Sequence, residues 1–316
     1  MKRIVLLLSC LSLCLVSLFA VMPIRPVHAA GACSNASSTA FGYVTGQAYA
    51  ASAGIKLGGS ASTGPQFLAY LGCDTNQSQD MASVGSLNIS PVGTAGTTQS
   101  TVTITKGATS LTVNEQSTLA NVSLLSGLIT ANSIQVAATS NGTATTASSS
   151  NGSNFGNLTL HVGVVPISVP ASPSPNTGFT LPGLGKLVVN EQTITNTADG
   201  TTISVNGLDI QVTAPNPFNL PVGGSIIIGH AESKFSRTQP TQTVCGYGYA
   251  FNGQATALGD SASSGPWVSA RVPAAGGHAQ DSLSTLTVPV LGNTGALSIT
   301  ADGQLTPNLD SHVTGT

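Results

Sequence analysis

Glu115 and Glu191 are the first candidates for chemistry, because they hold the same place in a Val-Asn-Glu-Gln segment that occurs twice. Two carboxylates about 5–9 Å apart can serve as acid and nucleophile, or acid and base, in glycoside hydrolysis. A sugar site usually offers stacking rings, yet few aromatic residues surround these acids and Trp267 is the single tryptophan. We therefore favour a structural role, in which each Asn-Glu-Gln ends a strand and binds local backbone.

His230 and Glu232 stand two residues apart, so both side chains would point to the same face of a strand. Such a pair can hold a metal or move a proton, although a polar pair on an edge strand is the simpler interpretation. Lys186 and Asn190 suggest the cross-link that a buried acid catalyses in some adhesins. Four residues along one strand place them too far apart for a direct bond. No known ligand arrangement includes the other mature histidines, which are His161, His278 and His312.

Standard catalytic and metal motifs are missing from the sequence. It contains no GxSxG nucleophile elbow, no HExxH and no phosphate-binding loop. The aspartates are scattered through polar turns rather than clustered as calcium ligands. The sequence therefore indicates no catalytic residue, no cofactor site and no metal site.

The N-terminus has the order of a signal peptide. Lys2-Arg3 precedes the apolar run Ile4–Met22, and Val27 and Ala29 occupy the −3 and −1 positions. We expect cleavage after Ala29. The same run is long enough to act as a membrane anchor instead, and Cys10 allows a weaker lipoprotein interpretation.

Five cysteines occur, and two of them lie in the signal. An odd number remains in the mature chain, so one disulfide and one free thiol are expected, with the pairing open. The absence of CxxC or a Cys/His cluster argues against zinc. The three remaining cysteines are Cys33, Cys73 and Cys245.

Composition excludes several classes of partner. Charged residues make up 6% and aromatic residues 4% of the chain. Nine basic residues stand against eleven acidic ones, and three basic residues leave with the signal, so the mature net charge is 6 − 11 = −5. Nucleic acid and anionic membranes both require a basic surface, which is not available here. Low charge with abundant Val, Ile and Thr is typical of all-β extracellular proteins.

The sharpest local signal is Asn206-Gly207, which stands between alternating apolar residues. Asn-Gly suits a type I′ turn, because both central residues need positive φ. The pattern predicts a hairpin with Ile203 opposite Ile210 and Val205 opposite Leu208, all four on one face.

Further strands are expected where Val, Ile and Thr alternate with polar residues. Ser140–Ser153 is a low-complexity stretch and is predicted to be a loop. The Pro-rich segment Ala171–Thr177 is predicted to be a connector. The predicted strands are Phe41–Ala53, Leu87–Ile89, Thr101–Thr105, Ser110–Gln116, Val122–Ile129, Ile134–Ala138, Leu158–Val165, Lys186–Thr195 and Ser225–Ile228.

Two internal duplications are present. In the first, Val113–Gln116 recurs as Val189–Gln192, and Ile134-Gln135-Val136 recurs as Ile210-Gln211-Val212, both at an offset of 76 residues.

The second duplication relates the two ends of the mature chain. Gly46-Gln47-Ala48 recurs as Gly253-Gln254-Ala255, and Ser60–Pro65 resembles Ser261–Pro266. The C-terminal residues therefore look like a truncated second start of the same module. We expect these C-terminal residues either to complete the sheet of residues 41–236 in the same chain or to donate strands to a neighbouring chain, with the two Gly-Gln-Ala strands side by side as one arrangement.

An ordered set of motifs resembles the choice-of-anchor P family. In order they are GQAYA at 46–50, a Gly-Pro turn at 64–65, SGLIT at 126–130, PSPNTGFTLPGLGKLVVNEQ at 173–192, ISVNGLDIQV at 203–212 and GGSIIIGHAES at 223–233. The resemblance implies an exported bacterial surface protein and supplies no catalytic residues. The C-terminal residues 308–316 show no sorting motif or apolar tail, which departs from the anchored pattern of that family.

The sequence thus predicts an all-β protein, an antiparallel β-sandwich-like module with internal duplication. Residues 1–29 are expected to be the signal, 30–236 a β domain and 237–316 a partial second β module. The expected role is non-enzymatic, in structure, adhesion or assembly at the bacterial surface. The alternatives are a carbohydrate-binding module and a hydrolase. The expected partners are another protein chain at an exposed sheet edge, or a surface glycan.

Overall fold

The computed structural model describes residues 42–53, 63–74, 78–89, 92–163, 165–238, 247–257, 260–271, 277–283, 287–288, 292–293, 297–304 and 310–315. All regular structure in these residues is β, which confirms the predicted fold class. The strands are β1 Tyr43–Ala53, β2 Thr63–Gln66, β3 Ala69–Asp74, β4 Ser78–Val84, β5 Leu87–Ile89, β6 Gly93–Ala95, β7 Thr98–Lys106, β8 Leu111–Leu124, β9 Ile129–Gly142, β10 Ala147–Gly156, β11 Thr159–Leu160, β12 Ile167–Ser168, β13 Thr177–Leu181, β14 Gly185–Asn196, β15 Gly200–Val212, β16 Ser225–Ser236, β17 Tyr247–Ala257, β18 Asp260–Arg271, β19 Gly277–Leu283, β20 Thr287–Val288, β21 Gly292–Asn293, β22 Leu297–Gln304 and β23 Asp310–Gly315. Within this part of the chain, no helix is long and apolar enough to cross a membrane.

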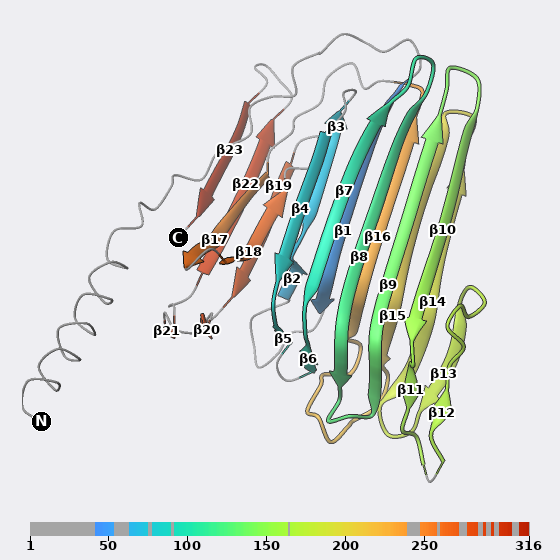
Figure 1. The fold of residues 1–316 in the computed structure, drawn as a ribbon, viewed down its shortest axis with the longest axis vertical. Coiled ribbons are helices and arrows are strands. Elements are labelled where there is room, and N and C mark those ends of the chain that lie inside the picture. Colours follow the sequence, from blue (N-terminus) through green and yellow to red (C-terminus); the bar gives the residue numbers. More distant parts are fainter. Residues whose placement is uncertain are drawn as a thin grey trace, which may run out of the picture.

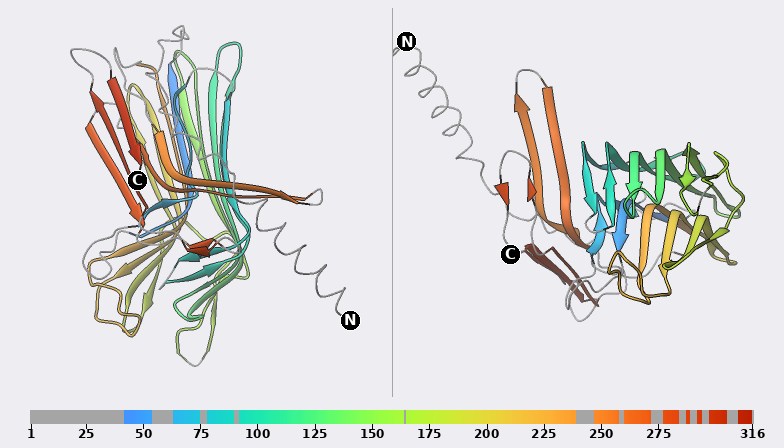
Figure 2. Two further views of the ribbon diagram at one scale, coloured as in Figure 1. Left: turned by 90° about the vertical axis from the view of Figure 1, so that its left-hand side faces the viewer. Right: turned by 90° about the horizontal axis from the view of Figure 1, so that it is seen from below.

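Two antiparallel sheets pack face to face (Figures 1 and 2). The first sheet has the order β13-β14-β15-β16-β1-β2, with β3 also paired to β1. The second has the order β12-β11-β9-β8-β7-β4-β18-β17, and β10 pairs with β9. The N-terminal strand β1 thus lies beside β16, which is far along the chain.

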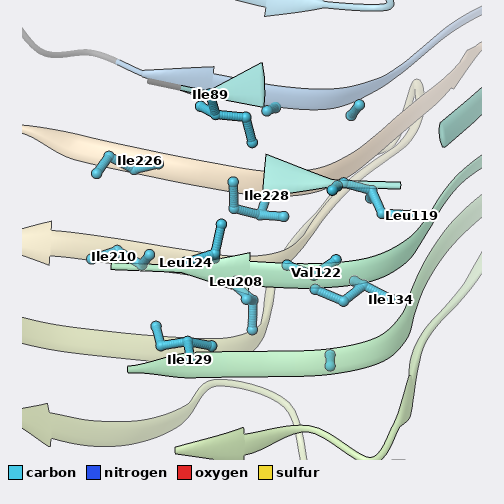
Figure 3. Packing of buried hydrophobic residues seen from close by; sticks show 14 of the residues in the cluster. Ile89, Leu119, Val122, Leu124, Ile129, Ile134, Leu208, Ile210, Ile226 and Ile228 are labelled. Carbon is cyan, nitrogen blue, oxygen red and sulfur yellow. The ribbon is translucent and has the colours of Figure 1, made fainter. Parts of the chain in front are cut away.

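The core lies between the sheets and is built from aliphatic side chains of both. Figure 3 shows Ile134 and Leu119 of the second sheet facing Leu208 and Ile228 of the first. All four are fully buried. Burial of apolar surface contributes about 25 cal/mol per Å², so this interior is the main source of stability.

A crease crosses both sheets where the alternation of side chains shifts by one residue. Asn121 in β8, Asn190 in β14 and Gly229 in β16 have positive φ values of 50°, 53° and 71°. Pairing keeps its register on both sides, as with Asn206↔His230 and Leu208↔Ile228. Asn and Gly are the residue types that tolerate this left-handed conformation.

The crease explains why the predicted hairpin at Asn206-Gly207 is wrong. β15 runs straight through this dipeptide and pairs with β14 on one side and β16 on the other. The turn lies earlier, where the backbones of Thr197 and Gly200 exchange hydrogen bonds. The four apolar residues assigned to one face are indeed all buried, because the alternation shifts at the crease; they are Ile203, Val205, Leu208 and Ile210.

Two other local predictions are corrected. Ser140–Ser153 is not a loop, because it holds the end of β9, a tight turn and most of β10. The turn is closed by Thr143 N–H donating to Thr146 O. Of the described residues in the strand predicted at 158–165, Thr159–Leu160 alone are extended and paired. The small polar residues of β10 form a strand because β9 pairs with them along their whole length.

The first duplication does not place its copies in equivalent positions. Its two copies lie in opposite sheets, in β8–β9 and β14–β15. Val113 pairs with Ser140, whereas its counterpart Val189 pairs with Leu208. The sequence repeat is therefore not a repeat of strand register.

The second duplication gives two hairpins, β1–β2 and β17–β18. β18 reaches the second sheet through one bridge, Gly265↔Ser83, and the hairpin extends beyond that sheet (Figure 2). The expected side-by-side arrangement of the Gly-Gln-Ala strands is wrong, because β1 and β17 belong to different sheets. β19, β22 and β23 form a separate three-stranded sheet. Cys33 and Cys245 lie outside the described residues, so the disulfide prediction stays a prediction.

Candidate functional site

The second Asn-Glu-Gln segment, Asn190–Gln192 in β14, is the centre of two polar networks. The crease lies at Asn190, which is 4% exposed. Glu191 belongs to one network, and Asn190 and Gln192 belong to the other. This segment does not end a strand, as the sequence suggested, because β14 continues to Asn196.

The first network is a chain of amides that joins the two sheets. Asn151 Nδ2 of β10 donates to Gln192 Oε1 at 2.5 Å, and Gln192 Nε2 donates to Asn190 Oδ1 at 2.8 Å. Asn190 Nδ2 in turn donates to the carbonyl of Pro173 at 2.9 Å. Asn176 closes the edge of β14, since its backbone N–H donates to Asn190 O and its Oδ1 accepts from the Gln192 N–H. Each amide is therefore held in a fixed orientation.

A groove of about 550 Å³ opens over this network. We name it the amide groove; its lining comes from β9, β10, the Pro-rich segment after β12 and β14. Gln135 and Asn154 add two further amides, and Pro173 and Pro175 add ring surface. None of the eleven lining residues is titratable.

The second network is a row of side chains across the first sheet. Asn206 Nδ2 donates to Glu191 Oε2 at 2.6 Å, which leaves Asn206 Oδ1 to accept from His230 Nδ1 at 2.6 Å. This pattern assigns the proton of the neutral imidazole to Nδ1. His230 also stacks on Tyr49, with ring centroids 4.3 Å apart. Its Nε2 is buried and has no hydrogen-bond partner among the described residues.

Burial keeps both rings neutral. It lowers the pKa of His230 to about 3 and raises the pKa of Tyr49 to about 12. Neutral His230 offers one lone pair at Nε2 and is a weak base, and no nucleophile touches it among the residues that the structure describes. β16 is a central strand, so the expectation that His230 and Glu232 lie on an edge strand is wrong.

Glu115 has a different environment, inside the sandwich. It is 2% exposed, and neither carboxyl oxygen has a partner of good geometry in the described residues. A Cβ on Gly46 would lie 2.1 Å from Glu115 Oε1, so the carboxyl group occupies the space that this glycine leaves. The nearby hydroxyl of Ser233 is engaged with Ser140 Oγ at 2.7 Å. Burial raises the pKa of Glu115 well above its ordinary value, and Ser233 offsets part of this.

The two glutamates do not form a shared site. The Glu115 carboxyl group faces β1, whereas Glu191 pairs with Asn206, which pairs with His230, which pairs with Tyr49 of β1. Three strand spacings of about 4.8 Å give a separation on the order of 14 Å. That exceeds the spacing of a glycosidase pair.

The remaining candidates are scattered. Lys186 and Asn190 are not joined, since the Asn190 amide binds Pro173 and Gln192. His161 Nε2 lies 3.3 Å from Thr130 Oγ1 on an exposed surface. His278 pairs with Asp302 at 2.6 Å, also exposed. Within the described ranges, no three His, Cys, Asp or Glu side chains gather as a metal site.

The sequence does not identify Asn206, Gln192 or Asn151 as functional candidates. It predicts Asn206 in a turn and Asn151 in a loop, whereas both lie on strands. The signal that could have revealed them is the repeated Asn-Glu-Gln itself, because three consecutive polar residues inside an apolar strand require partners.

Comparison of the chain with family models, with curated proteins and with solved structures gives no match.

Replacing Asn206 with alanine should lower the free energy of unfolding by about 1–3 kcal/mol, because it leaves the buried His230 Nδ1–H without an acceptor. Urea denaturation measures the change. Asn88→Ala is the matched control, since Asn88 is exposed on the short strand β5, and it should stay within about 0.5 kcal/mol. Equal effects in the two variants would show that the row does not stabilise the fold.

Proposed function

We propose that this chain is an exported, non-enzymatic β protein that acts in adhesion or assembly at the bacterial cell surface. The single observation that carries the proposal is the amide groove. Its polar groups are interlocked donors and acceptors with no titratable residue among them. Such a lining suits binding and offers no group for proton transfer.

Two sequence features support the location. The basic, apolar and small-residue order of the first 29 residues is that of an export signal. The ordered motifs between 46 and 233 resemble the choice-of-anchor P family, whose members are exported surface proteins.

The test begins with fractionation of the bacterium that makes the protein. The mature chain should be found outside the cytosol, and its N-terminal sequence should begin at Ala30 or within one or two residues of it. Beads coated with residues 30–316 should bind intact cells, whereas albumin-coated beads should not. A cytosolic chain that begins at Met1, or beads that fail to bind, would contradict the proposal.

A further inference from the structure

We propose that the amide groove binds an uncharged, polyhydroxylated ligand, namely a surface glycan. This inference rests on the proposed surface function and specifies its ligand. Four features of the groove support it: the chemistry of its polar groups, its ring surface, its rigidity and the closure of the neighbouring strand edges.

The polar groups match hydroxyls. A carboxamide carries both donors and acceptors, and a sugar hydroxyl can donate and accept at once. After the internal bonds are made, Asn151 keeps its Oδ1, and Gln192 keeps one N–H. A charged ligand would lose hydration in the groove without meeting an opposite charge.

The apolar part of the lining is small. Pro175 is exposed and presents ring C–H surface, Pro173 is buried beneath, and Ala137 adds a methyl group. Gly152 and Asn154 lie on the exposed face of β10, paired with Ala137 and Gln135 of β9, and on the other face of the strand from Asn151. A Cβ at Gly152 would meet no atom within 4 Å, so this part of the lining is open. Pyranose rings carry C–H faces between their hydroxyl edges, and such a face can lie against this surface. The volume of about 550 Å³ lies in the usual range for small-molecule sites.

The groove is already ordered before a ligand arrives. The amide chain ties β10, β14 and the Pro-rich segment together, and Asn190 is almost fully buried. Side chains that are fixed in advance lose little entropy on binding.

An extended peptide fits this place less well, because the strand edges beside the groove are already engaged. Phe155 N–H of β10 donates to Ala171 O at 2.8 Å. Asn176 holds the Asn190 carbonyl and the Gln192 N–H of β14. Strand addition needs free N–H and C=O groups, and those of Phe155 N–H, Asn190 C=O and Gln192 N–H are already bonded.

Isothermal titration calorimetry of residues 30–316 tests the proposal. The probes are soluble neutral oligosaccharides (pentamers of glucose, xylose, mannose and N-acetylglucosamine), an acidic oligogalacturonate and an extended Ser/Thr-rich peptide. At least one neutral oligosaccharide should bind, and the acidic and peptide probes should not.

The decisive variant is Gly152→Leu, which should weaken that binding at least tenfold, since Gly152 lines the groove and the larger side chain takes up open space there. The melting temperature should change little, because a Cβ at this position meets no atom within 4 Å. Asn154→Ala should weaken binding several-fold. Gly85→Leu is the matched control, because a Cβ at Gly85 also meets nothing within 4 Å and Gly85 does not line the groove.

The glycan assignment is overturned if no neutral oligosaccharide binds, if a charged or peptide probe binds in its place, or if Gly152→Leu and Gly85→Leu bind alike. Such results leave surface location and cell binding as separate measurements, so failure of this inference is distinguishable from failure of the proposed function.

Discussion

Replacing Gly142 with alanine should lower the free energy of unfolding by about 3 kcal/mol. Gly142 ends β9 and faces Phe235 of β16 across the sandwich. A Cβ at Gly142 would lie 2.1–2.3 Å from three atoms of that ring. Phe235 is fully buried among Val44, Val113 and other core residues, so the ring has little room to move. Urea denaturation followed by circular dichroism measures the loss.

Gly152 supplies the control, because it also follows an asparagine in the neighbouring strand and its Cβ would meet nothing. Gly152→Ala should change stability by no more than about 0.5 kcal/mol. The double variant Gly142→Ala with Phe235→Leu should lose clearly less than the sum of its single variants, since the smaller side chain removes the clash. A neutral Gly142→Ala would mean that Phe235 does not lie under β9.

Acid should destabilise the protein through His230. The unfolded chain protonates this ring near pH 6.5, whereas burial lowers the folded pKa to about 3. The stability that neutral His230 provides is present above pH 6.5 and falls as the pH drops toward 3, by about 1.4 kcal/mol per pH unit. The total loss is on the order of 5 kcal/mol. Urea denaturation from pH 8 to pH 4 should show this slope, and His230→Gln should remove it.

Glu115 works in the opposite direction, because burial raises its folded pKa. The protonated form is favoured in the fold, so stability is highest at low pH and falls as the pH rises above the ordinary value for glutamate. Asp80 shifts in the same direction, also through burial. The difference between wild type and Glu115→Gln isolates the Glu115 part. If that difference does not change with pH, the carboxyl group is solvated rather than buried.

The abundance of Val, Ile and Thr predicts the fold class correctly, but it does not predict which strands pair with each other. Val, Ile and Thr marked β14 and the first four residues of β16 correctly, whereas the single strand β15 was expected to be a hairpin. Asn206-Gly207 misled because Asn-Gly favours positive φ in a turn, whereas here Gly207 lies inside a strand. A Cβ on Gly207 would meet Ile228 O at 2.8 Å and the methyl groups of Ile134 and Val136 at 2.9 Å. This glycine is needed for close packing between sheets, and that contact involves residues about 70 positions away.

The candidate site could be predicted only in part, because its contacts also join residues far apart in the sequence. The repeated Asn-Glu-Gln points to Glu115 and Glu191. Glu191 belongs to a polar network, and Glu115 is buried without a hydrogen-bond partner among the described residues. What the repeat could not show is that one glutamate lies inside the sandwich against Gly46, while the other joins a part-buried row of side chains across the first sheet. Their surroundings are set by which sheet each strand joins, and identical tetrapeptides carry no information on that choice.

The pairing of β1 with β16 sets the order in which the chain can fold. Strands β7 to β10 join their sequence neighbours in turn, so they can assemble as soon as each is made. β1 is synthesised early but has to wait for β16, whose residues Ser225–Ser236 come far later. Closing so large a loop is slow compared with local hairpins. β2 and β3 can pair with one edge of β1 at once. During that interval the other edge of Tyr43–Ala53, which carries no charged residue, stays open to wrong partners. A chaperone that holds the N-terminal strand until synthesis passes residue 236 would therefore raise the yield of folded protein.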